Sequence, residues 1–133
     1  MKASIKTVIA LALGLAAGDA LAYGSSSSSG HCDKPIFTEF QPAPNKYLQS
    51  FTEFSFIVSS NTTTTSIVAN ISSGSIQYHL SAKELKFFPL KNGQTEVRGK
   101  LPRPIEHGFA RLNVTAHSKP GCEKTDGYLL RIQ

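Results

Sequence analysis

Apolar and polar residues alternate along several short segments of this chain. The clearest segment is 52–58, in which Phe54, Phe56 and Val58 share one face of an extended backbone while polar side chains occupy much of the other. A period of two predicts a strand with one buried face. Segments 109–116 and 128–132 repeat the pattern. We expect the core to centre on the apolar residues of these three segments, namely Phe54, Phe56, Leu112, Val114, Leu130 and Ile132.

Turn-forming residues separate the alternating segments. Asn92 and Gly93 lie between two apolar runs, which is the strongest short-range signal for a hairpin. Segment 81–85 is the only candidate for a helical turn, and 118–127 is predicted to be the loop before the last strand. The predicted strands are 35–41, 52–58, 66–71, 75–80, 85–90, 95–98, 109–116 and 128–132. About eight strands in roughly a hundred residues predict an all-β fold, an antiparallel β-sandwich of about seven or eight strands.

The first 22 residues have the pattern of a signal peptide. Lys2 and Lys6 flank the start of an apolar stretch at 7–18, and small residues at positions 20 and 22 suit signal peptidase. We expect cleavage after Ala22, which gives an exported mature chain with no segment long enough to insert in a membrane. Residues 23–31 are serine-rich and are predicted to form a flexible tail. This leaves residues 32–133 as one domain.

Composition and charge argue against a nucleic-acid partner. The chain has 133 residues, of which 40% are hydrophobic and 17% charged, as in an ordinary globular domain. The formal charge is +5, and the basic residues are spread out rather than gathered in the stripe that nucleic acid requires. We interpret Phe87 and Phe88 as core residues of strand 85–90 rather than as a platform for stacking bases.

No motif indicates an enzyme. The chain has no Gly-x-Ser-x-Gly elbow and no glycine-rich phosphate loop. Glu39 and Glu53 fall on outward faces of predicted strands, where a solvated charge is expected. The histidines at positions 79, 107 and 117 do not stand at metal-ligand spacing from one another. We interpret them as surface or strand-end residues.

Two parts of the chain carry a resemblance to a known family. Residues 37–45 and 51–56, and then 101–102, 108–114, 118–122 and 127–132, are similar to the opening strands and closing hairpin of the CopC-type periplasmic copper-resistance proteins. Other bacterial immunoglobulin-like domains share these motifs. The resemblance implies an immunoglobulin-like β-sandwich and a periplasmic or secreted location in a bacterium.

The copper ligands of that family are largely missing here. The family holds Cu(II) with an N-terminal histidine and with an Asp and a His from a loop reading Asp-Gly-His. Here Pro120 stands in place of the Asp and Cys122 in place of the His, while His31 follows the predicted tail instead of starting the mature chain. The family's methionine-rich Cu(I) site is also missing, since Met1 is the only methionine.

A cysteine stands instead at each end of this region. Two cysteines in an exported chain usually form a disulfide, and the fold implied by the resemblance brings Cys32 and Cys122 together. A bond closing a loop of about 90 residues is worth at most about 4 to 5 kcal/mol in the chain-entropy account. The alternative is a metal site made by His31, Cys32 and Cys122, a ligand set suited to Cu(I) or zinc.

Two functions follow from these alternatives. The first is a non-catalytic binding or accessory module of the periplasm, stapled by a disulfide and without a cofactor, whose partner is another periplasmic or envelope protein. The second is a CopC-like copper-binding protein whose metal site has been rebuilt from histidine and cysteine.

Overall fold

The computed structural model describes residues 31–133, of which Asp33–Gln133 form one compact unit. The predicted signal peptide and the serine-rich tail up to residue 30 lie outside the described residues. The strands are β2 (Phe37–Gln41), β3 (Tyr47–Leu48), β4 (Phe51–Val58), β5 (Val68–Ser73), β6 (Ile76–Leu80), β7 (Lys86–Pro89), β8 (Thr95–Ile105), β9 (Gly108–His117) and β10 (Glu123–Ile132). Three single turns of 3₁₀-helix complete the set: η4 (Thr64–Ser66), η5 (Ala82–Glu84) and η6 (Lys91–Gly93). No helix in this described part has the length and apolar character needed to cross a bilayer.

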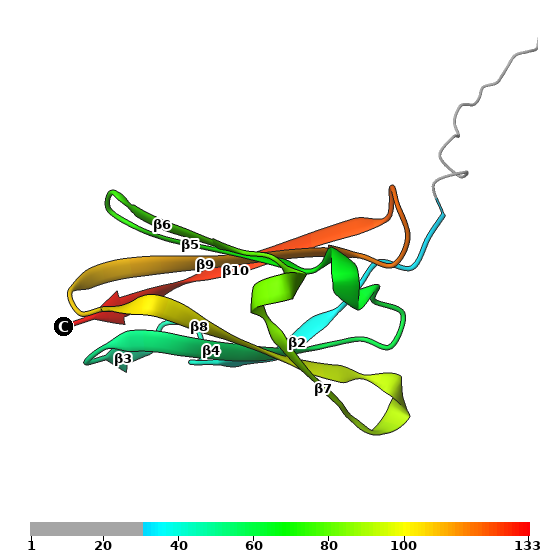
Figure 1. Cartoon of the computed structure of the whole chain (residues 1–133), viewed down its shortest axis with the longest axis horizontal. Coiled ribbons are helices and arrows are strands. Elements are labelled where there is room, and N and C mark those ends of the chain that lie inside the picture. Colours follow the sequence, from blue (N-terminus) through cyan, green and yellow to red (C-terminus); the bar gives the residue numbers. More distant parts are fainter. Residues whose placement is uncertain (1–30) are drawn as a thin grey trace, which may run out of the picture. The chain divides into compact units, whose positions relative to one another are not determined.

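The strands form two sheets, as Figure 1 shows. One sheet has five strands in the order β3-β10-β9-β5-β6, and the other has four in the order β2-β4-β8-β7. Neighbouring strands are antiparallel except for β3, which pairs in parallel with β10 over two residues. The predicted antiparallel β-sandwich is therefore confirmed, with one short strand more than the predicted eight.

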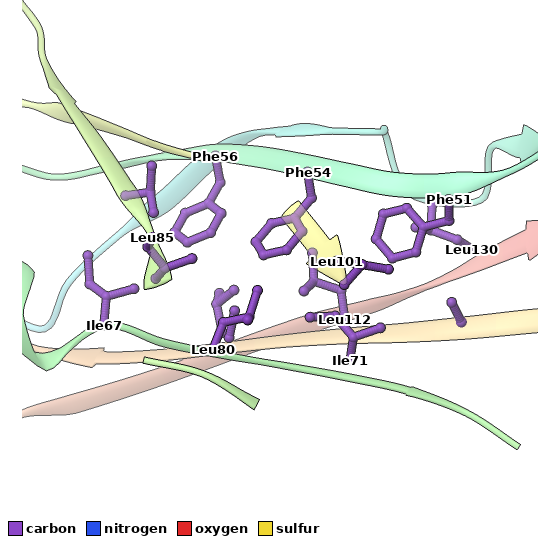
Figure 2. Close-up of a cluster of buried hydrophobic side chains, with 14 of the residues drawn as sticks. Phe51, Phe54, Phe56, Ile67, Ile71, Leu80, Leu85, Leu101, Leu112 and Leu130 are labelled. Atoms are coloured by element: carbon purple, nitrogen blue, oxygen red, sulfur yellow. The ribbon is translucent and has the colours of Figure 1, made fainter. Parts of the chain in front are cut away.

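The core lies between the two sheets, where the inward faces of their strands meet. Along β9 the residues Ala110, Leu112, Val114 and Ala116 are buried while their neighbours are not, which is the alternation read from the sequence. Figure 2 shows Phe51, Phe54 and Phe56 of β4 pointing toward Ile71 and Leu112 of the other sheet. All six residues predicted for the centre of the core are buried.

The structure corrects two strand boundaries. The prediction that 118–127 is a loop is wrong from residue 123, because β10 continues its ladder with β9 as far as Glu123 opposite His117. The predicted strand 95–98 likewise continues to Ile105, although Pro102 and Pro104 interrupt the apolar pattern. The partner strand β7 pairs with β8 only as far as Arg98. The β4–β8 ladder is also interrupted between Lys100 and Ile105, so both prolines lie where a missing backbone donor costs little.

Both predicted turns are present. Asn92 and Gly93 adopt φ angles of 65° and 77° between β7 and β8, the left-handed conformation that an Asn-Gly turn provides. Segment 81–85 contains η5, and the hydroxyl and backbone N–H of Ser81 both donate to the Glu84 carboxylate at 2.7 Å. These hydrogen bonds lower the pKa of Glu84.

Candidate functional site

The disulfide end of the domain is built around Cys122, which is fully buried in the β9–β10 connection. Its N–H donates to the Lys119 carbonyl at 2.9 Å, and its carbonyl accepts from Ser118 N–H at 3.2 Å. Cys32 precedes β2 and is partly buried. Both cysteines are disulfide-bonded, and they are the only two in the chain, so the expected Cys32–Cys122 bond is present.

Side chains near this connection are engaged in a hydrogen-bond network that the sequence did not reveal. Thr63 donates through its N–H to the His117 carbonyl at 2.9 Å and through its hydroxyl to the Ser118 carbonyl at 3.0 Å. The N–H of His117 donates in turn to the Ser66 hydroxyl at 3.0 Å. These bonds join η4 and its flanking residues to the end of β9. Serines and threonines in low-complexity sequence gave no indication of which backbone groups they would satisfy.

The residues suggested for a metal site do not make one in this structure. Sulfurs in a disulfide are not thiolates, and thiolate is the form of cysteine that binds metal. His31 is exposed, and Pro120 and Gly121 provide no side-chain ligand in the loop. Across residues 31–133, no three His, Cys, Asp or Glu side chains are grouped so that they could hold a metal ion. The side chains present therefore do not fit the copper site that the family resemblance implies.

The other histidines lie in separate places. His79 on β6 has its Nδ1 atom 2.7 Å from the side-chain oxygen of Asn70 on β5. His107 is exposed in the connection between β8 and β9, whereas His117 lies at the opposite end of β9. The Nδ1 atom of His117 is buried and has no hydrogen-bond partner among the described residues. Their positions agree with the interpretation of these residues as surface and strand-end histidines.

An exposed row of aromatic and arginine side chains spans three neighbouring strands at one edge of the five-stranded sheet. Phe109 of β9, Arg131 of β10 and Tyr47 of β3 are partners in adjacent strands, and we call these three residues the aromatic–arginine row. Tyr47 is 62% and Phe109 57% exposed. Arg131 Nη1 donates to the Tyr47 hydroxyl at 2.8 Å, and its guanidinium carbon lies 5.4 Å from the centre of the Tyr47 ring. The sequence missed this row because a strand of two residues has no detectable period.

Two hollows border Phe109. One, of about 310 Å³, is lined by the three residues of the row and by Gly108, Ile132 and Gln133. The other, of about 680 Å³, lies between the β5–β6 and β8–β9 connections and is lined in part by Ile76, Ile105 and Phe109. Because Ile76 is 42% exposed, this second hollow has an apolar wall that water contacts.

A second arginine and aromatic pair lies on the four-stranded sheet. The Arg98 guanidinium stands 4.3 Å above the ring centre of Phe88, and its Nε donates to Glu96 at 2.9 Å. That hydrogen bond and the Glu96 charge raise the pKa of Arg98. Phe88 is therefore an outer-face residue, and its placement in the core was wrong. Phe87, on the opposite face of β7, does pack against the core.

Comparison with known proteins relates the chain to solved structures through its fold. No protein-family profile and no curated protein sequence matches it. The structure of PcoC, a methionine-rich copper resistance protein from Escherichia coli, aligns with a TM-score of 0.51 at 13% identity, covering 76% of this chain and 100% of that one. A second PcoC structure, of the selenomethionine protein, aligns with a TM-score of 0.51 at 14% identity over 74% of this chain and 99% of that one. The chain thus has a β-sandwich resembling that of the CopC-type copper resistance proteins.

Proposed function

We propose that this protein is an exported, non-catalytic immunoglobulin-like binding module of the periplasm, which recognises another periplasmic or envelope protein. The observation that carries the proposal is the Cys32–Cys122 disulfide. It takes up the two sulfurs that a rebuilt metal site would need. It also suits an oxidising compartment, where disulfides form and persist.

The proposal leaves the disulfide a structural role. Once the sulfurs are bonded to each other, His31 is the only member of the suggested ligand set that retains a metal-binding atom. A single exposed imidazole does not hold copper tightly against ordinary chelators. The surfaces left for function are the sheet faces and the connections at the ends of the sandwich.

Copper calorimetry on the oxidised mature protein tests this proposal. We expect no free thiol on titration with a thiol reagent and only weak Cu(II) binding through histidines acting singly. His31→Ala should then change the heat of binding little, and His107→Ala serves as the matched exposed control. Stoichiometric, sub-micromolar binding that disappears in His31→Ala would show that the protein is a copper binder instead.

The likeness to PcoC favours a second candidate, a copper-binding protein that uses reduced cysteines. In this case the Cys32–Cys122 bond would first be reduced, and the two thiolates would then bind Cu(I) together with His31, since thiolates are well suited to that ion. Protein isolated from the periplasm would contain two free thiols, and Cys32→Ser would abolish Cu(I) binding. If thiol titration of that material finds none, this candidate is excluded.

A further inference from the structure

Two arginines of this domain lie against exposed aromatic rings, but only one has an acidic neighbour. Arg98 stands over Phe88 and is paired with Glu96 at 2.9 Å. Arg131 stands beside Tyr47, and its hydrogen-bond partner there is the neutral tyrosine hydroxyl. Within residues 31–133, Arg98–Glu96 is the only ion pair. The Arg131 guanidinium therefore keeps donors that no carboxylate of the described chain occupies.

The charges around Arg131 also differ from those around Arg98. Arg111 is exposed and lies two residues from Phe109 along β9, so both side chains are on the same face of the sheet. On β9 and β10 the exposed acidic residues are Glu123 and Asp126, which pair with His117 and Val114 toward the far end of the ladder. Close to the row, Arg111 and Arg131 give these strands a positive charge, whereas Glu106 of the β8–β9 connection is the acidic residue that lines the larger hollow beside Phe109.

The same end also presents apolar surface. The rings of Tyr47 and Phe109 are more than half exposed, and Phe109 borders both the 310 Å³ hollow beside Arg131 and the 680 Å³ hollow beside Ile76. Tyrosine, phenylalanine and arginine are enriched in protein interfaces, where rigid rings bury area and arginine binds carboxylates in a two-pronged geometry.

We propose that the aromatic–arginine row docks an acidic, partly apolar segment of a partner protein. A carboxylate of that segment binds the Arg131 guanidinium between the two rings, and a neighbouring apolar side chain enters the hollow lined by Phe109 and Ile76. The proposal rests on the binding-module function and names its surface and the chemistry of its partner. Arg111 and Arg131 are only two positive charges beside exposed rings. They favour a protein segment over a polyanion, which needs a longer run of positive charge.

A titration with defined peptides tests the proposal. The full mature protein, oxidised and labelled with ¹⁵N, is titrated with acetyl-Glu-Leu-Glu-Phe-Glu-amide and with the matched peptide in which every Glu is Gln. We expect the acidic peptide to shift the amide signals of Tyr47, Phe109 and Arg131, and the Gln peptide to bind at least tenfold more weakly. Loss of one charge-assisted hydrogen bond is expected to raise the dissociation constant about tenfold or more.

Variants at exposed positions separate this surface from the rest of the domain. Arg131→Gln should weaken binding of the acidic peptide at least tenfold, and Phe109→Ala should weaken it about tenfold. Thermal melts confirm that both variants fold. Arg98→Gln is the matched control, an arginine over an aromatic ring on the other sheet, and should leave the affinity unchanged. An equal loss in Arg98→Gln would point to non-specific charge attraction and overturn the proposal.

Other results of the titration would overturn the docking proposal. Absence of peptide binding, or shifts confined to other residues, would show that the row is not a docking surface for such segments. If sulfated dextran shifts these signals and the peptide does not, the surface binds anionic polysaccharide and the proposal is wrong. Copper calorimetry is independent of these peptide and polysaccharide titrations. Weak copper binding together with no peptide-induced shift at Tyr47, Phe109 or Arg131 would overturn this inference alone. Tight copper binding would overturn the binding-module function.

Discussion

Tyr128 shows how a single side chain couples the closing strand to the start of the domain. Its hydroxyl donates to the Pro42 carbonyl at 2.9 Å, and its ring meets the Phe40 ring edge-on with centroids 5.0 Å apart. Burial raises the pKa of Tyr128 far above its ordinary value near 10. The folded protein therefore keeps this hydroxyl protonated at a pH where the unfolded chain loses the proton.

This difference predicts that stability falls in alkali. Since the folded pKa is the higher one, the contribution is complete below about pH 10 and is lost as the pH rises further. Tyr128→Phe should cost about 1 kcal/mol at pH 7 through the lost hydrogen bond, and its stability should fall less steeply above pH 10. Urea denaturation at pH 7 and pH 11 measures both effects. If the free energy of unfolding fell equally between pH 7 and pH 11 in the wild type and in Tyr128→Phe, Tyr128 would not be the source of the pH dependence.

Among the elements, β4 contributes the largest share of aromatic side chains to the core. Phe56 is fully buried and has the rings of Phe37, Phe40 and Phe54 around it at centroid distances of 5.9, 5.6 and 6.3 Å. Gly99, opposite Phe54 on β8, leaves room for the Phe54 ring, with which an added Cβ would collide. The strand is thus packed tightly along its inner face.

Truncation of the central ring tests this packing. We predict that Phe56→Ala destabilises the domain by about 3 to 5 kcal/mol, because a buried aromatic side chain leaves a cavity when it is removed. Phe88→Ala on the exposed face of β7 is the control and should cost less than about 1 kcal/mol. Chemical denaturation gives both values. A loss for Phe56→Ala as small as the control's would mean that the core is centred elsewhere.

The elements that the sequence predicted are those with a strong period or a specific turn. β4 alternates over residues 54–58 and β9 over residues 110–117, and Asn92 with Gly93 marks a turn through backbone geometry that few residues adopt. β3 and the first half of β10 escaped prediction because tertiary pairing creates them. β3 has two residues, and the start of β10 is polar on both faces. Local patterns contain no information on such pairing.

For the whole molecule, the candidate site was predictable only in its covalent part. Two cysteines in a chain predicted to be exported, together with the fold implied by the family resemblance, predicted the disulfide. The aromatic–arginine row depends on Tyr47 and Arg131, which are 84 positions apart and become neighbours only through the parallel pairing of β3 with β10. A surface assembled from such distant segments has no signature in one sequence.

Loss of the disulfide should lower the stability of the entire domain. We predict that Cys122→Ser costs about 2 to 5 kcal/mol, which lowers the melting temperature by on the order of 10 °C or more. Cys32→Ser and the chemically reduced native protein should melt at nearly the same temperature as Cys122→Ser. A melting temperature unchanged on reduction would remove the structural role assigned to the bond.

The exported form itself can be checked by its mass. We expect the mature chain to begin at Tyr23, because the small residues Ala20 and Ala22 precede it as signal peptidase requires. Intact-mass spectrometry of periplasmic protein measures the start directly. Ala22→Asp should block processing in the same host, and a chain that retains its leader without that substitution would contradict the assignment.

The pairing of β10 with β3 has a consequence for when the protein can fold. β10 follows the other described strands in the chain, yet β3 and β9 both pair with it, and its Tyr128 bonds to Pro42, 86 positions earlier. Contacts between such distant segments form slowly, on the millisecond-to-second scale of β-sandwiches. Until β10 is in place, β9 has an open edge on which other chains could assemble. The pairing of β10 therefore closes the edge of β9 that would otherwise favour aggregation.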